Sequence, residues 1–167
     1  MKTCIFIVGD KSAGKSSTVR SLTGYGKSTK RIIWNLRKDN GDIITSFIVN
    51  SAITELKPQT QEHLPQNFPD SLEKQFEVNR NQYELLICTF RLNTPKKYAF
   101  EEYIKKAKSE GFDVKIAIIE KGWEEITDDI NHILDICKRQ NVEYLTLDLT
   151  KDYHPEAGRI RTKFFPK

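Results

Sequence analysis

Short apolar runs alternate along the chain with segments whose apolar residues recur every three or four positions. The runs predict buried strands, and the helical spacing predicts amphipathic helices between them. The expected strands cover residues 3–8, 31–38, 43–49, 83–92, 114–119 and 142–148. The expected helices cover residues 15–23, 71–81, 95–110 and 123–137, with a short last helix opened by Pro155. Because each long helix lies between buried strands, we expect a mostly parallel sheet with helices on both faces.

Two segments depart from this alternation. Residues 39–42 have the sequence Asp-Asn-Gly-Asp, and an Asn-Gly pair is typical of a tight turn between antiparallel strands. Residues 50–70 contain three prolines and few apolar anchors, which predicts a long loop, and such loops are often functional. The whole pattern predicts one α/β domain over residues 1–167, with about six strands and one antiparallel hairpin strand.

A glycine-rich segment follows the first expected strand. Its sequence, Gly-Asp-Lys-Ser-Ala-Gly-Lys-Ser, matches the G-x-x-x-x-G-K-[ST] pattern of a phosphate-binding P-loop. The first N–H groups of the following helix have no intrahelical partner and carry the positive end of the helix dipole, so they favour an anion. An ordinary Gly/Ser-rich turn is the alternative. The expected phosphate-binding residues are Gly9, Asp10, Lys11, Ser12, Ala13, Gly14, Lys15, Ser16 and Ser17.

Two of these side chains have distinct roles in the pattern. Lys15 is expected to reach the terminal phosphates and to assist catalysis by neutralising their charge. The Ser16 hydroxyl is expected to bind Mg²⁺. The sequence therefore predicts a nucleoside triphosphate, ATP or GTP, as the ligand and Mg²⁺ as the cofactor.

The order of the expected elements resembles that of small GTPases, a branch of the P-loop NTPases whose second strand forms a hairpin with the third. In that family a threonine before the second strand binds magnesium, and Thr29 or Ser28 stands at that place. The family's D-x-x-G motif after the third strand is replaced here by Asn50-Ser51-Ala52-Ile53. The resemblance therefore implies that Asn50 holds a metal-bound water without contributing charge. Glu55, shortly beyond, is a candidate for orienting the attacking water.

Guanine selectivity in that family uses an N-K-x-D motif after the fifth strand. The corresponding residues here are Glu120-Lys121-Gly122-Trp123, and a tryptophan cannot accept the hydrogen bonds that the aspartate receives from the base. Trp123 is a candidate for stacking on a base or for packing in the core. Glu120 and Asp148 end later strands, and the resemblance implies that both lie too far from the first strand to contact magnesium.

Composition and charge narrow the class of protein. The chain has 30% charged and 38% hydrophobic residues and no apolar run long enough to span a bilayer, so we expect a cytoplasmic protein without a membrane partner. Residues 1–40 carry nine Lys and Arg against two Asp, which suits a triphosphate ligand. A net charge of +4 is compatible with nucleic acid but does not require it. The three cysteines, each in an apolar pattern, are expected to be buried thiols.

Three functions remain open on these grounds. The leading interpretation is slow hydrolysis of the triphosphate, or a nucleotide-dependent switch. A small-molecule or nucleotide kinase is the second, with Arg91, Arg159 and Arg161 available to close over the phosphates and residues 50–70 as a lid. The third is a non-catalytic scaffold that holds nucleotide and contacts a protein partner through residues 51–70. The missing D-x-x-G and N-K-x-D motifs keep this third interpretation open.

Overall fold

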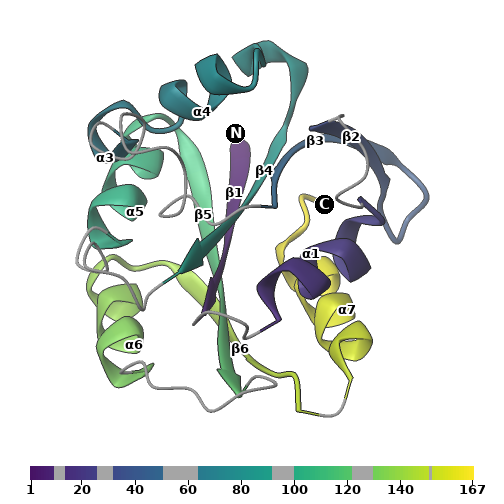
Figure 1. Ribbon diagram of the computed structural model, residues 1–167, viewed down its shortest axis with the longest axis vertical. Coiled ribbons are helices and arrows are strands. Elements are labelled where there is room, and N and C mark those ends of the chain that lie inside the picture. The colour runs from purple at the N-terminus through teal and green to yellow at the C-terminus, as the bar shows by residue number, and fades with distance from the viewer. Residues whose placement is uncertain (10–13, 26–31, 51–63, 92–99, 122–129, 151) are drawn as a thin grey trace.

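Six strands form one sheet with helices on both faces in the computed structural model (Figure 1). The structure describes residues 1–9, 14–25, 32–50, 64–91, 100–121, 130–150 and 152–167. The strands are β1 (Lys2–Gly9), β2 (Ile33–Arg37), β3 (Ile43–Val49), β4 (Leu85–Arg91), β5 (Phe112–Lys121) and β6 (Glu143–Asp148). The helices are α1 (Lys15–Thr23), α3 (Leu64–Asn67), α4 (Asp70–Gln75), α5 (Phe100–Ser109), α6 (Ile130–Arg139), α7 (Tyr153–Phe164) and the 3₁₀ turn η2 (Arg80–Gln82).

The strands lie in the order β2-β3-β4-β1-β5-β6, and every neighbouring pair is parallel except β2 with β3. This confirms the predicted mostly parallel sheet and its antiparallel hairpin. Gly41, in the hairpin turn, has a φ of +92°, a conformation that glycine adopts readily. Because the other five strands run in one direction, their carboxyl ends meet at a single edge of the sheet.

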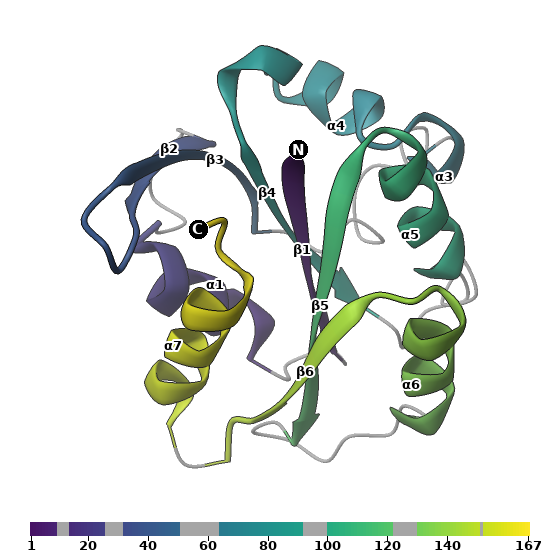
Figure 2. The same cartoon turned by 180° about the vertical axis from the view of Figure 1, so that it is seen from behind.

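The two faces of the sheet are covered by different helices (Figures 1 and 2). Helices α3 to α6 cover one face, where the ring of Phe6 from β1 lies 5.7 Å from that of Phe68 and 6.1 Å from that of Phe100. Helices α1 and α7 cover the other face. There Ile5 and Ile7 of β1 share a core with residues of α1 and α7, namely Val19, Leu22, Ala157, Ile160 and Phe164.

The helix predicted over residues 71–81 is shorter in the structure. Helix α4 ends at Gln75, and Glu77 then takes a left-handed φ of +55°. The Val78 N–H donates to Glu73 O at 2.8 Å, which closes the turn, and the Asn79 side chain caps η2. The apolar pattern nevertheless gave the inward residues correctly, because Leu72 and Val78 are buried and Phe76 packs against the core.

The last helix is longer than predicted. Helix α7 has 12 residues and begins before Pro155, because the Asp152 side chain accepts a hydrogen bond of 2.9 Å from the His154 N–H and caps the helix. Arg161 ties it to the rest of the chain by donating to Leu22 O at 3.1 Å and to Asp39 at 3.3 Å.

The predicted loop over residues 50–70 contains the short helix α3, and α4 begins at its last residue. The other predicted strands and helices agree with the structure where it describes them. All six predicted strands end within two residues of the observed bounds. The starts of two predicted helices, at residues 95–99 and 123–129, lie outside the described residues. Among the helices that the structure describes, none is long and apolar enough to cross a membrane.

The three cysteines are buried and form no disulfide, as predicted. Burial raises the pKa of the Cys4 and Cys88 thiols and raises that of Cys137 to about 11, so all three stay protonated at neutral pH. In the described part of the chain, no group of three or more His, Cys, Asp or Glu side chains could hold a metal ion.

Truncation of Ile160 tests whether α7 is part of the core. Ile160 is completely buried beneath α7, so Ile160→Ala should lower the free energy of unfolding by about 2–5 kcal/mol in urea denaturation. Thr162→Ala, an exposed position on the same helix, is the control and should change it by no more than about 0.5 kcal/mol. Equal small losses for both variants would mean that α7 does not cover this face in solution.

Candidate functional site

The two ends of the glycine-rich loop are held by β1 and α1. Gly9 is the last residue of β1, and Gly14 precedes α1 with a φ of +102°, which favours glycine at this position. Gly14 is the N-cap of α1 and has no side chain with which to cap the first N–H groups of the helix. The start of α1 therefore suits an anion. The intervening predicted residues Asp10, Lys11, Ser12 and Ala13 lie outside the described residues.

The Lys15 side chain turns back toward the end of β1. It is only 8% exposed, and its Nζ donates to the carbonyl oxygen of Gly9 at 3.1 Å. The lysine thus links the beginning of α1 to the end of β1. A buried ammonium group is kept only where hydrogen bonds or anions replace its lost water, and the Gly9 carbonyl oxygen is one such partner.

The structure brings Ser16 and Asn50 together. The Ser16 hydroxyl contacts the backbone oxygen of Asn50 at 3.5 Å, and Asn50 directly follows β3. Ile44 and Ile48 of β3 belong to the core beneath α1, so the alternation of the strand directs Asn50 to the same face. Two of the predicted magnesium-site residues are therefore neighbours. The third, Thr29, lies outside the described residues, as does Glu55, the candidate for orienting the attacking water.

The amide of Asn50 is buried without a partner. Neither its Oδ1 nor its Nδ2 has a hydrogen bond within the part of the chain that the structure describes. Buried polar side chains usually have partners, and an unsatisfied group costs about 1–3 kcal/mol. The Oδ1 atom can accept a hydrogen bond and the Nδ2 group can donate one, so the amide suits an ordered water or the water shell of a cation. The chemistry of the pair fits the predicted role of holding a metal-bound water.

Arg91 brings a second cation to this edge. It is the last residue of β4 and pairs in parallel register with Gly9. Leu85 and Ile87 of the same strand belong to the core beneath α1, so Arg91 projects from the α1 face, and its Nε is buried. The sequence identified Arg91 only as one of three available arginines, because the register between distant strands is not visible in it.

The other two arginines, Arg159 and Arg161, hold α7 in place. Arg159 donates to Thr146 O at 3.1 Å and to Glu156 at 2.8 Å, and Arg161 binds the end of α1 and the hairpin turn. None of these four contacts involves the ends of the glycine-rich loop, Gly9 and Gly14.

The position of β5 corrects one expectation from the resemblance. β5 pairs directly with β1, with Val8 opposite Ile118, so the fifth strand is not distant from the first. Glu120, exposed near the end of β5, is therefore one strand away from the loop. Asp148 ends β6, two strands from β1, as expected. The predicted base-stacking candidate, Trp123, lies outside the described residues.

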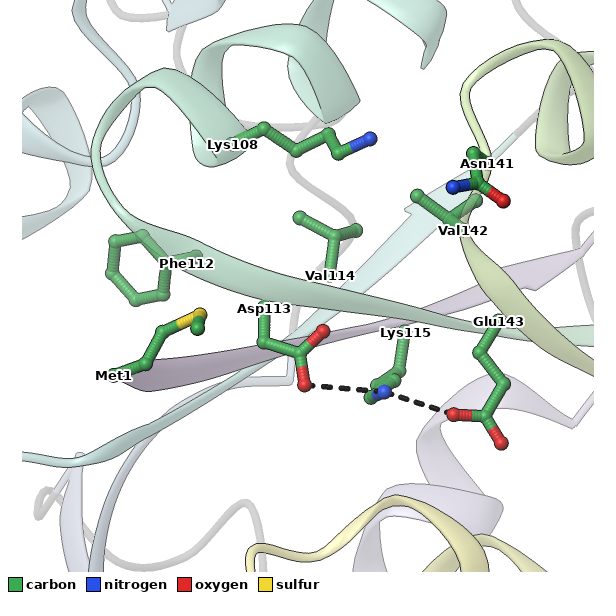
Figure 3. A pocket seen from close by; sticks show the side chains of 9 residues that line it. All are labelled: Met1, Lys108, Phe112, Asp113, Val114, Lys115, Asn141, Val142 and Glu143. Carbon is green, nitrogen blue, oxygen red and sulfur yellow. Dashed lines mark hydrogen bonds and ion pairs between the residues drawn. The ribbon is translucent and has the colours of Figure 1, made fainter.

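The opposite edge of the sheet also has a hollow, of about 480 Å³, at the amino ends of β5 and β6 (Figure 3). Its charges compensate one another: Lys115 lies 3.1 Å from Asp113 and 2.8 Å from Glu143, and Lys108 donates to the backbone oxygen of Gln140. None of the motif residues lines this hollow. The candidate site is therefore the carboxyl edge, where Gly9, Lys15, Ser16, Asn50 and Arg91 meet.

Replacing the Asn50 amide with an apolar group tests whether it is unsatisfied in the ligand-free protein. Asn50→Leu keeps the branching at Cγ and removes both polar atoms, so it should raise the free energy of unfolding by about 1 kcal/mol or more. Chemical denaturation without ligand measures this, and Asn131→Leu, at an exposed position on α6, controls for a general gain from an added apolar side chain. A loss of stability specific to Asn50→Leu would contradict the assignment.

Comparisons with known proteins give the fold. No protein-family model and no curated protein matches the sequence. A de novo designed protein described as PLOOP2X3_50 fold is 12% identical, with a TM-score of 0.56 and coverage of 98% of this chain and 94% of the other. A second designed protein is 12% identical, with a TM-score of 0.53 and coverage of 98% and 92%.

A natural protein is similar as well. The FeoB G-domain from Methanococcus jannaschii is 15% identical to this chain, with a TM-score of 0.52 and coverage of 97% of each chain. At such low identity these likenesses show the fold alone. This chain therefore has a P-loop-like α/β fold, with a six-stranded, mostly parallel sheet enclosed by helices.

Proposed function

We propose that this chain binds a nucleoside triphosphate with Mg²⁺ at the carboxyl edge of its sheet and hydrolyses it slowly. The observation that carries the proposal is the buried Lys15 ammonium, which reaches back from the start of α1 to Gly9 at the end of β1. The N–H groups at the start of α1 and the lysine both favour a bound phosphate. The likeness to the FeoB G-domain, which has the same fold, supports a nucleotide as the ligand.

Ser16 and Asn50 are the described residues best suited to magnesium. Mg²⁺ prefers oxygen ligands, keeps several of its waters and is commonly bound together with substrate phosphates. The Ser16 hydroxyl would bind the ion directly, and the Asn50 amide would orient one of its waters. Because an amide carries no charge, we expect a weaker hold on the metal than a carboxylate would give. Thr29 remains a proposed further ligand.

The expected reaction is slow because one requirement is incompletely met. Phosphoryl transfer to water needs neutralised phosphate charge and a positioned water. Lys15 and Mg²⁺ would supply the first. For the second, β3 is followed by an amide rather than a carboxylate, and Glu55 is only a proposed water-orienting residue. Phosphate release should therefore be far below the range of about 1–100 s⁻¹ typical of kinases.

The neutral Asn50 also favours a second candidate function, a scaffold that binds nucleotide without turning it over. The proposed partner surface is residues 51–70. Its last part is held against the body of the protein, since Phe68 and Pro69 are buried. Residues 51–63 are therefore the better candidates for contact with another protein.

Removal of the Lys15 charge tests the proposed function. Lys15→Met keeps an unbranched side chain in the buried site but cannot bind phosphate, so it should abolish measurable affinity for ATP and GTP. A thermal-shift panel with ATP, GTP, ADP and GDP, with and without Mg²⁺, measures this. A ligand at a hundred times its Kd stabilises the folded protein by about 2.7 kcal/mol, which is readily detected.

The control for this experiment is Lys138→Met, an exposed lysine on α6. It should bind nucleotide like the wild type. Circular dichroism of the Lys15 variant should show an intact fold. Equal nucleotide binding by the wild type and Lys15→Met would disprove the proposed site, and no binding by the folded wild type would disprove the proposed function.

A carboxylate at position 50 tests the magnesium site. Asn50→Asp adds a negative charge beside Ser16, so the Mg²⁺ concentration that half-saturates triphosphate binding should fall severalfold. Triphosphate affinity measured across a magnesium titration, with phosphate release followed in parallel, gives the answer. An unchanged magnesium dependence would remove Asn50 from the metal site.

A further inference from the structure

We propose that Arg91 binds the terminal phosphate of the nucleotide and makes the site selective for a triphosphate over a diphosphate. The inference rests on the proposed function, because it assigns a residue to the same site. It also gives the chain a fixed cation that does not depend on a partner protein. The assignment follows from the order of the strands, from their register and from the charge at the strand ends.

The strand order places Arg91 beside the glycine-rich loop. β4 lies between β1 and β3, and Arg91 at its end pairs in register with Gly9, the first residue of the loop. Neighbouring strands are about 4.8 Å apart, so the backbone of Arg91 lies one strand spacing from the start of the loop. The proposal places a phosphate held at the start of α1 within reach of this long side chain.

The side chain of Arg91 is directed to the correct face. The alternate residues Leu85 and Ile87 pack beneath α1, and Thr89, next in the series, is 1% exposed. Arg91 continues this series on the face that carries Lys15 and Ser16, with its Nε buried. The planar guanidinium has five donors in a fixed geometry, which suits the oxygens of a phosphate better than a lysine does.

The neutral residue at the end of β3 complements this cation. Val49 pairs with Cys88, so Asn50 lies level with Thr89, close to Arg91 on the neighbouring strand and on the same face. A carboxylate at position 50 would attract the guanidinium and hold it away from the phosphates. With an amide there, position 50 carries no negative charge that would compete with the phosphates for Arg91. An amide implies weaker magnesium binding and so less neutralisation of the phosphate charge. The cation of Arg91 would supply part of that neutralisation.

The magnitude of the effect follows from the kind of bond. A hydrogen bond to a charged group changes affinity by roughly tenfold to a hundredfold. Since only a triphosphate carries the terminal group, this loss should appear for ATP or GTP and be nearly absent for the diphosphate. A purely structural arginine, or one that acts through its general positive field, would weaken both nucleotides together.

The experiment measures the affinities of a triphosphate and of its diphosphate by calorimetry, both with Mg²⁺ and with a chelator. A non-hydrolysable triphosphate analogue avoids turnover. The variants are Arg91→Gln and Arg91→Lys, and the matched control is Arg37→Gln, an exposed arginine on β2. Arg91→Gln should lose at least tenfold in triphosphate affinity and less than about threefold in diphosphate affinity. Arg91→Lys should recover part of the loss, and Arg37→Gln should match the wild type.

Three results would overturn the inference. The affinities for the two nucleotides could fall equally in Arg91→Gln, both could stay unchanged, or Arg37→Gln could show the same loss. In each case the proposed function would still hold if the wild type binds nucleotide and Lys15→Met does not. If the folded wild type binds neither nucleotide, the proposed function fails, and the role of Arg91 fails with it. Unfolding curves of each variant show whether a loss of nucleotide affinity comes only from misfolding.

Discussion

Complete burial of the central strand governs the rest of the structure. Residues Cys4 to Val8 of β1 are wholly inaccessible, enclosed by β4 and β5 at the sides and by a helical layer on each face. A polar side chain at any of these positions would lose its water without gaining a partner, at a cost of several kcal/mol by the usual magnitudes. The chemistry of the chain is thereby confined to the strand ends, and α1 must begin within a few residues of Gly9.

Local patterns were sufficient to predict most of the fold. The bounds of α1 and β3 agree with those predicted from apolar periodicity and turn chemistry, because both elements bury a regular set of side chains. The predictions for α4 and α7 were wrong at their ends, where a left-handed Glu77 and a capping Asp152 decide the outcome. These are single-residue effects on backbone conformation, and periodicity carries no information about them.

The site was predictable only where one contiguous segment forms it. The sequence identified Gly9, Lys15 and Ser16 together, since their spacing alone brings them around one loop. It placed Asn50 near them through the resemblance but could not show that its amide is buried and unpartnered. The position of Arg91 depends on β4 lying between β1 and β3, a pairing of strands distant in sequence. Such pairings are decided by the packing of the whole sheet.

Among the described residues, the polar groups near the two edges of the sheet are satisfied to different extents. Near the amino ends of the strands, Arg80 pairs with Asp70, Glu73 and Glu110, and the Tyr83 hydroxyl donates to Glu73 at 2.6 Å. The chain can therefore build a closed polar network around a partly buried cation. At the carboxyl edge, by contrast, the amide of Asn50 beside Ser16 has no hydrogen-bond partner among the described residues. A group that lowers stability in the free protein is retained more readily where a ligand supplies its missing partners. A hydrated cation on a bound phosphate would do so here, and the cost of Asn50 is then a consequence of binding rather than a defect of packing.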